Sequence, residues 1–121
     1  MEQQPNETPL REKPVTEIAT TLQEVLGQRL TAYAICEHDP TKIGAFARAE
    51  AEPDSDSETV LRDLAQITET LVQDSGPEIT RAIMIGSNPL LGDEAPVQLI
   101  HNREYDAVLN AGERLVTADG S

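Results

Sequence analysis

Apolar residues recur at intervals of three and four along much of this chain, and this spacing constrains the fold more than any other feature. The clearest stretch places one apolar face on a single long helix: Val60, Leu61, Leu64, Ile67, Thr68, Leu71 and Val72. An earlier helix is indicated by Val15, Ile18, Ala19, Leu22, Val25 and Leu26, and Gly27 stands where it is expected to end. No stretch alternates convincingly, as a strand would. The sequence therefore predicts an all-α fold.

Two shorter helices are expected after Gly27. One covers about residues 28–37, and another begins at Asp39 and Pro40, which suit an N-cap and a first helical position. The inward positions of the two are predicted to be Leu30, Tyr33, Ala34, Ile43, Phe46 and Ala47. Two short helices separated by so tight a turn indicate a small helix-turn-helix in the N-terminal half.

Two capping signals predict two further helices. The spacing of Ser55 and Glu58 is that of a capping box and opens the long helix, which should run to about Asp74. Residues 75–78 repeat the box. They begin a helix that is apolar on nearly every side through Ile79, Ala82, Ile83, Met84 and Ile85. We expect that segment to lie at the centre of the core or in a dimer interface.

The chain of 121 residues is long enough for one domain, or for two very small ones that share a core. Residues 1–13 are polar and rich in proline, so we expect a disordered leader there. The helix-turn-helix-like region would be 14–53 and a helical C-terminal domain 54–121. Only three residues are aromatic, Tyr33, Phe46 and Tyr105. So thin a core would gain from a partner chain, and a homodimer is expected.

The 22 acidic and 9 basic residues give a formal net charge of −13, which disfavours a general nucleic-acid binder. Any DNA contact would be confined to a small basic face. Five of the acids fall within nine residues, at Glu50, Glu52, Asp54, Asp56 and Glu58. A solvated linker with helix-capping acids is the favoured interpretation of this run, and a contact for a basic protein is the alternative.

The chain has no apolar run of the roughly 20 residues that cross a bilayer, and its start lacks the pattern of a signal peptide. A single cysteine, Cys36, agrees with a reducing compartment. We therefore expect a cytoplasmic protein with no membrane contact.

Catalysis is not expected. Cys36, Glu37, His38 and Asp39 are consecutive, so their side chains point in different directions and cannot converge on one ion. Only His101 is left to join them from far along the chain. Neither a phosphate-binding glycine loop nor a carboxylate pair is present. The sequence thus predicts no catalytic residue, no metal and no cofactor.

The stretch from Ser87 to Leu109 has the pattern of a docking surface. Asn88 and Pro89 end the preceding helix, and Gly92 allows a tight turn. A new helix can begin at Pro96 with an apolar edge formed by Val97, Leu99 and Ile100. The apolar stripe of a closing helix follows at Tyr105, Val108, Leu109, Gly112, Leu115 and Val116.

Two segments resemble parts of the bacterial Xre/MbcA/ParS antitoxins. Residues 32–53 resemble their degenerate Xre-type helix-turn-helix. Residues 83–109 resemble their toxin-binding domain, with Asn-Pro-x-Leu from Asn88, Pro-x-x-Leu from Pro96 and Tyr-x-x-Val-Leu from Tyr105, in order and at family spacing. The resemblance covers about residues 15–117.

This resemblance implies an all-helical, usually dimeric antitoxin whose C-terminal part covers the active site of a RES-domain toxin that breaks down NAD. The toxin-binding residues would be Asn88, Pro89, Leu90, Leu91, Leu99, Arg103, Tyr105 and Leu109. Their apolar members would form the anchor, and Arg103 would lie on the polar rim with Glu104 and Glu113. The alternative is that these apolar residues belong to the core, because periodicity does not distinguish an interior from an interface.

In the same family the helix-turn-helix binds the promoter of its own operon. Here Ala45 and Ala51 replace residues that are commonly basic, which leaves Thr41, Lys42 and Arg48 for weak DNA binding. Cys36 occupies a turn position that is often glycine, Ala95 leaves Pro96 without a side-chain N-cap, and Ile83 stands where tryptophan is common. The alternatives to an antitoxin are a helix-turn-helix transcriptional regulator and an acidic interaction protein whose DNA contact has been lost.

Overall fold

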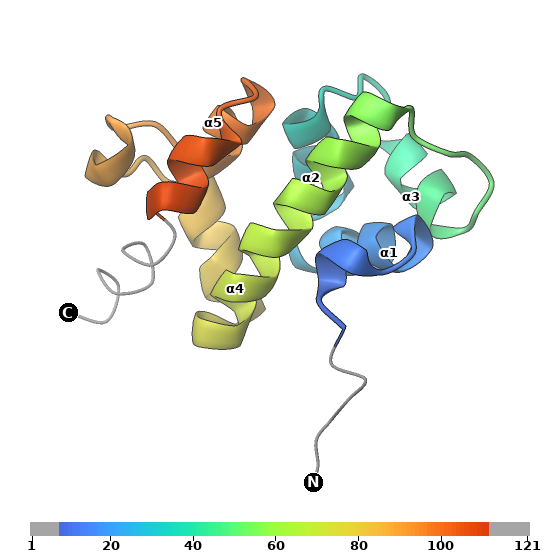
Figure 1. The fold of residues 1–121 in the computed structure, drawn as a ribbon, viewed down its shortest axis with the longest axis horizontal. Helices are drawn as coiled ribbons and strands as arrows, with labels where there is room; N and C mark the ends of the chain where they lie inside the picture. The colour runs from blue at the N-terminus through green and yellow to red at the C-terminus, as the bar shows by residue number, and fades with distance from the viewer. Residues whose placement is uncertain (1–7, 112–121) are drawn as a thin grey trace, which may run out of the picture.

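Every regular element is a helix among residues 8–111, the part of the chain that the computed structural model describes (Figure 1). In chain order the elements are the 3-10 helix η1 (Leu10–Glu12), α1 (Val15–Val25), α2 (Gln28–Ile35), α3 (Thr41–Ala47), α4 (Ser55–Ile85), the 3-10 helix η2 (Pro89–Leu91) and α5 (Pro96–His101). Residues 105–111 are helical as well. The all-α fold predicted from the sequence is confirmed. Residues 112–116 of the predicted closing helix, with Leu115 and Val116, lie outside the described residues, as does Glu113.

The long helix α4 is two helices joined end to end. Gly76 inside it has φ of 86° and ψ of 167°, and Pro77 follows, so the backbone bends sharply at this point (Figure 1). The predicted boundary near Asp74 is therefore correct. The predicted caps are not, because Asp54 rather than Ser55 accepts the Ser57 N–H, at 2.8 Å. The hydroxyl of Ser75 donates to Asp74 instead of capping the second helix.

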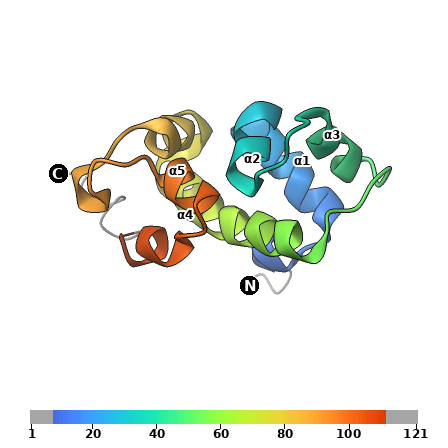
Figure 2. The ribbon, with the colours of Figure 1, turned by 90° about the horizontal axis from the view of Figure 1, so that it is seen from above.

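The first part of α4 is the common support of the other elements. The helices α1, α2 and η1 all contact α4, and α3 packs on α1 and α2 (Figure 2). Ile43 and Phe46 are buried as predicted. Tyr33 is not, with 39% of its surface exposed, since α2 buries Thr31, Ala32, Ala34 and Ile35 instead. The Tyr33 ring faces α5, a contact that helical periodicity within α2 does not reveal.

The predicted disordered leader extends too far along the chain. Residues 1–7 lie outside the described part, but Leu10 is buried at 6% exposure and belongs to the core. Its N–H donates to the carboxylate of Glu69 on α4, at 3.2 Å. Arg62 on the same helix donates to the carbonyl groups of Arg11 and Lys13. A single leucine among polar residues gives no periodic signal, which is why the sequence did not predict this contact.

One continuous core serves both halves of the chain. The buried apolar cluster runs from Leu10 to Ala111 and includes Ile18 and Leu22 of α1, as well as Val97 and Ile100 of α5. Two irregular positions agree with the sequence analysis. Cys36 ends α2 with a left-handed φ of 65°, and Ala95 gives α5 no side-chain cap. Among residues 8–111 no helix is both long and apolar enough to cross a membrane.

Replacing Leu10 tests whether the segment before α1 is part of the fold. We expect Leu10→Ala to lower the free energy of unfolding by about 2–4 kcal/mol, because it leaves a cavity against α4. Leu90→Ala is the matched control, since Leu90 is 41% exposed, and it should change stability by less than about 0.5 kcal/mol. Urea denaturation followed by circular dichroism measures both. Equal midpoints for the two variants would contradict the packing of Leu10.

Candidate functional site

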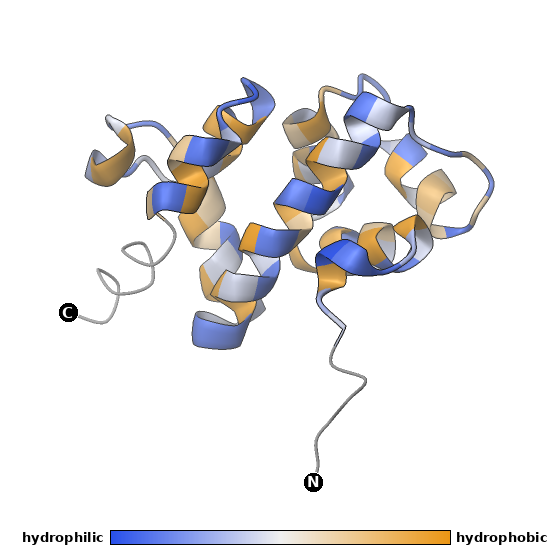
Figure 3. Ribbon diagram, in the orientation of Figure 1, coloured by the Kyte–Doolittle hydropathy of each residue, from blue (hydrophilic) through white to orange (hydrophobic). Residues whose placement is uncertain are grey.

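Large apolar side chains on the surface concentrate in the C-terminal third. Within the described residues those most exposed are Tyr33, Ile79, Ile85, Leu90 and Leu109. Four of these five follow the break at Gly76. Figure 3 shows apolar residues on η2, at the left edge of the view, and on the second part of α4. Exposed apolar side chains make this third of the chain the candidate region for an interaction surface.

The turn that carries Leu90 is held by backbone contacts. The Asn88 side chain accepts the Leu90 N–H at 2.8 Å, and the Asn88 carbonyl accepts from Leu91 and Asp93, both at 2.9 Å. The Asn88 N–H donates to the Glu94 carbonyl at 3.1 Å, and Gly92 has a left-handed φ of 67°. The role of Asn88 is thus to hold the turn in one conformation, with Pro89 and Leu90 on its outer side.

The predicted toxin-binding residues Pro89, Leu90, Leu91, Leu99, Tyr105 and Leu109 differ in how far they are buried. Leu91 and Leu99 are each 7% exposed and belong to the core, as the alternative interpretation of the sequence proposed. Pro89, Leu90 and Leu109 lie on the surface. Tyr105 is intermediate, and burial together with the nearby Asp63 raises the pKa of its hydroxyl. That hydroxyl oxygen is buried and has no hydrogen-bond partner among the described residues.

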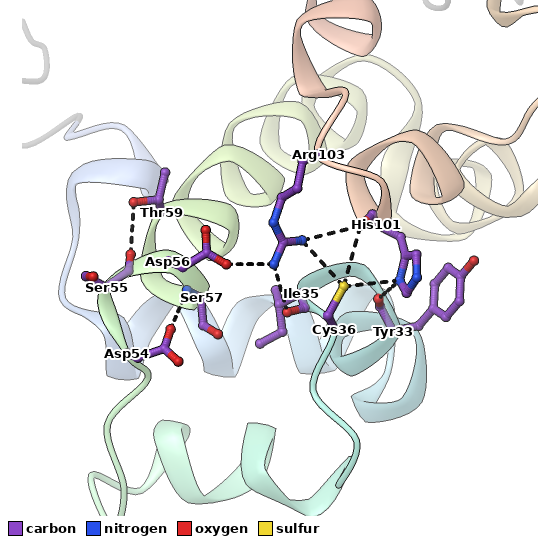
Figure 4. A network of polar contacts seen from close by, with 10 residues as sticks. All are labelled: Tyr33, Ile35, Cys36, Asp54, Ser55, Asp56, Ser57, Thr59, His101 and Arg103. Atoms are coloured by element: carbon purple, nitrogen blue, oxygen red, sulfur yellow. Dashed lines mark hydrogen bonds and ion pairs between the residues drawn. The ribbon is translucent and has the colours of Figure 1, made fainter.

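Arg103 does not stand on an open polar rim but contacts other helices of the same chain. We call its contacts, together with those of His101 described next, the joint. Its Nη2 atom lies 2.8 Å from Oδ2 of Asp56, at the start of α4, and 3.5 Å from the carbonyl oxygen of Ile35 (Figure 4). Its Nη1 atom lies 3.6 Å from Sγ of Cys36. The hydrogen bond to Asp56 is the main cause that raises the pKa of Arg103. Arg103 therefore ties the end of α5 to α2 and α4.

A ring stack continues this joint. The Tyr33 and His101 rings are 4.1 Å apart between centroids and 10° from parallel. Nδ1 of His101 lies 2.6 Å from the carbonyl oxygen of Tyr33, so that nitrogen carries the hydrogen and donates it. The Tyr33 hydroxyl contacts the Gln98 side chain, and Sγ of Cys36 lies 3.5 Å from Nδ1 of His101 (Figure 4). These contacts join α2 to α5.

The sequence did not reveal this joint, because its partners are between 47 and 68 residues apart. His101 does reach Cys36, whereas Asp39 instead accepts the Thr41 N–H at 3.0 Å, ahead of α3. No group of three or more histidine, cysteine, aspartate or glutamate side chains placed to hold a metal occurs within residues 8–111.

Four carboxylates of the acidic run have partners within the chain. Asp54 caps α4, Asp56 pairs with Arg103, Glu58 with Arg62 at 2.8 Å, and Glu50 with Arg48 at 3.1 Å. Hydrogen bonding to Arg48 lowers the pKa of Glu50, and the Ser57 N–H lowers that of Asp54. These contacts favour the linker interpretation of the run over a contact for a basic protein.

The predicted DNA-binding residues lie on or just after α3. Thr41 donates its hydroxyl to Asp39 at 2.7 Å, and Arg48 is held by Glu50. Lys42 is exposed and has no ion pair among the described residues. Within residues 8–111 this face thus offers DNA one cation outside an ion pair, and the charge of that lysine also acts on the carboxylate of Asp39.

The geometry of these sites does not identify a protein family, so we compared the chain with known proteins. No family model, curated protein or solved structure matches the chain. The resemblance to the Xre/MbcA/ParS antitoxins, and the helix-turn-helix itself, stay predictions. The functional argument therefore depends on the exposed surface and its charges.

The joint can be measured by a double-mutant cycle on Arg103 and Asp56. Arg103→Ala should lower the free energy of unfolding by about 1–2 kcal/mol, because several hydrogen bonds are lost together. The coupling to Asp56→Ala should be about 0.5–1 kcal/mol, since Asp56 is 71% exposed and solvent screens the pair. Arg29→Ala, at an exposed position of α2, is the control and should change little. An Arg103→Ala variant as stable as this control would contradict the joint.

Proposed function

We propose that this protein is an antitoxin-type binding protein that neutralises a partner enzyme by covering its active site. The observation that carries the proposal is the exposed leucine on the rigid turn, Leu90, in the third of the chain where apolar side chains gather on the surface. Leu109, which is 43% exposed, adds a second apolar contact from the helical residues 105–111. Protein interfaces commonly depend on a few such apolar anchors surrounded by polar residues.

The rigidity of the turn supports this proposal. The contacts of Asn88 already fix the backbone around Leu90, so docking would order few additional groups. The joint at Arg103 and His101 similarly fixes α5 against α2 and α4. A surface that is ordered before binding loses less conformational entropy when a partner docks.

Charge indicates the kind of enzyme. Asp93 and Glu94 follow Leu90 and are exposed, as is Asp106 before Leu109. Acidic residues next to apolar anchors in the chain suit a partner whose active site is positively charged, as is a site that binds the phosphates of a dinucleotide. This agrees with the resemblance, which implies an NAD-degrading RES-domain toxin.

Substitution of the anchor tests the proposal. We expect a tagged chain, purified from its native host with nuclease treatment, to retain a stoichiometric enzyme whose NAD-degrading activity it suppresses. Leu90→Asp and Leu109→Asp should each weaken that complex by about 30-fold or more, because a carboxylate would be buried in the interface. Thr70→Asp, at an exposed position on the first part of α4, is the control for added charge. Thermal unfolding shows that each variant folds.

Unchanged affinity and unchanged inhibition in both folded aspartate variants would overturn the docking surface. The activity of the purified enzyme is also measured with and without the chain. An unsubstituted chain that binds the enzyme without inhibiting it would overturn occlusion of the active site. Aspartate variants that lose both binding and inhibition would support occlusion.

The alternative function, a transcriptional regulator that binds DNA through α3, is tested by DNA binding. Since Arg48 is paired with Glu50 and the chain carries a net charge of −13, we expect no saturable binding to upstream DNA, even at about 50 mM salt. Fluorescence anisotropy with a labelled duplex measures this. Saturable binding that falls steeply with salt and disappears in the double variant Lys42→Ala/Arg48→Ala would favour the regulator.

A further inference from the structure

The second part of α4, residues 77–85, has one buried face and one open, largely apolar face. Thr80 and Met84 are fully buried against the rest of the molecule. Ile79 and Ile85 are 44% and 55% exposed, and Ala82 between them is exposed as well. The described residues thus leave about half of each isoleucine open to solvent, although isoleucine is one of the residue types most often found inside proteins.

The two isoleucines lie symmetrically about Ala82 on the open face, which also carries the exposed Glu78, about 40° from Ala82, with Gly86 at the symmetric position. At about 100° per residue, Ile79 and Ile85 lie about 60° to either side of Ala82 and about 4.5 Å before and after it along the helix axis. Thr80 and Met84 lie about 160° from Ala82, so the buried face is directly opposite. Such a face can match a copy of itself that runs in the reverse direction, because a two-fold axis exchanges the two isoleucines.

We propose that this face binds the same face of a second copy of the chain, with the two helices antiparallel and a two-fold axis beside Ala82. Ile79 of one copy then packs against Ile85 of the other, and the pair occurs twice. The small side chain of Ala82 lets the helices approach closely at the axis. An interface of this kind is isologous, the arrangement of most homodimers. The inference depends on exposure and helical geometry, and the proposed function does not enter it.

Charge favours a second copy at this face. Residues 75–92 contain one acid and one base, Glu78 and Arg81, whereas the whole chain carries a net charge of −13. The acids that give this excess therefore lie elsewhere. Two copies that meet through the acidic linker would bring like charges together, but at the Ala82 face they meet through a segment of zero net charge.

A cysteine beside the two-fold axis provides a direct test, because that residue lies next to its own counterpart. We expect Ala82→Cys in a Cys36→Ser background to form a disulfide-linked dimer under mild oxidation, seen on a non-reducing gel. Thr70 is exposed on the first part of α4, and Thr70→Cys in the same background should form little disulfide-linked dimer. Equal cross-linking of the two variants would overturn the proposed axis.

Sedimentation equilibrium of the full chain measures the same interface without cross-linking. The unsubstituted chain should dimerise with a dissociation constant between about 1 µM and 1 mM. Ile79→Asp or Ile85→Asp should raise this constant by about 100-fold, because each substitution occurs twice in the interface. Leu90→Asp should leave the dimer intact, which separates this inference from the proposed function. A monomer at every concentration, or a dimer that persists in both isoleucine variants, would overturn the proposal.

Discussion

The fold depends on the buried face of the first part of α4, which is shared by elements from both ends of the chain. Leu61, Leu64 and Leu71 are fully buried on this helix, whose neighbours include α1, α2, η1 and α5. A chain with three aromatic residues has few bulky side chains to fill separate cores, so the aliphatic face of one long helix serves the whole molecule. This face ends at the break at Gly76. The break redirects residues 77–85, which leaves Ile79 and Ile85 on the surface.

The joint between α2 and α5 has a different role, since it makes the C-terminal third one body with the rest. Arg103 donates hydrogen bonds to Asp56, Ile35 and Cys36, and His101 stacks on Tyr33. Because Leu91 and Leu99 are buried, the remaining apolar groups on this surface hold fixed positions. A binding surface built in this way is ordered before any partner arrives, which is the physical basis of the proposed antitoxin-type function.

The sequence predicted the helices well, because burial of one helical face is a local pattern with a period that can be counted. The inward Ile43 and Phe46 follow from it, whereas Gly27 and the residues after Asp74 indicated the helix end and the break through local glycine and capping signals. The site was predicted only in part. Periodicity marks Leu90 and Leu91 equally as apolar, and only the conformation of the turn shows which one faces outward. Arg103 seemed suited to an open rim because nothing in the sequence relates it to Asp56.

Amide hydrogen exchange of the chain, alone and in the complex with the proposed partner enzyme, would test the docking surface most directly. The account predicts that exchange slows at residues 88–93 and 105–111 on binding, while α3 exchanges at the same rate in both states. Slower exchange confined to α3, with residues 88–111 unchanged, would contradict a docking surface in the C-terminal third.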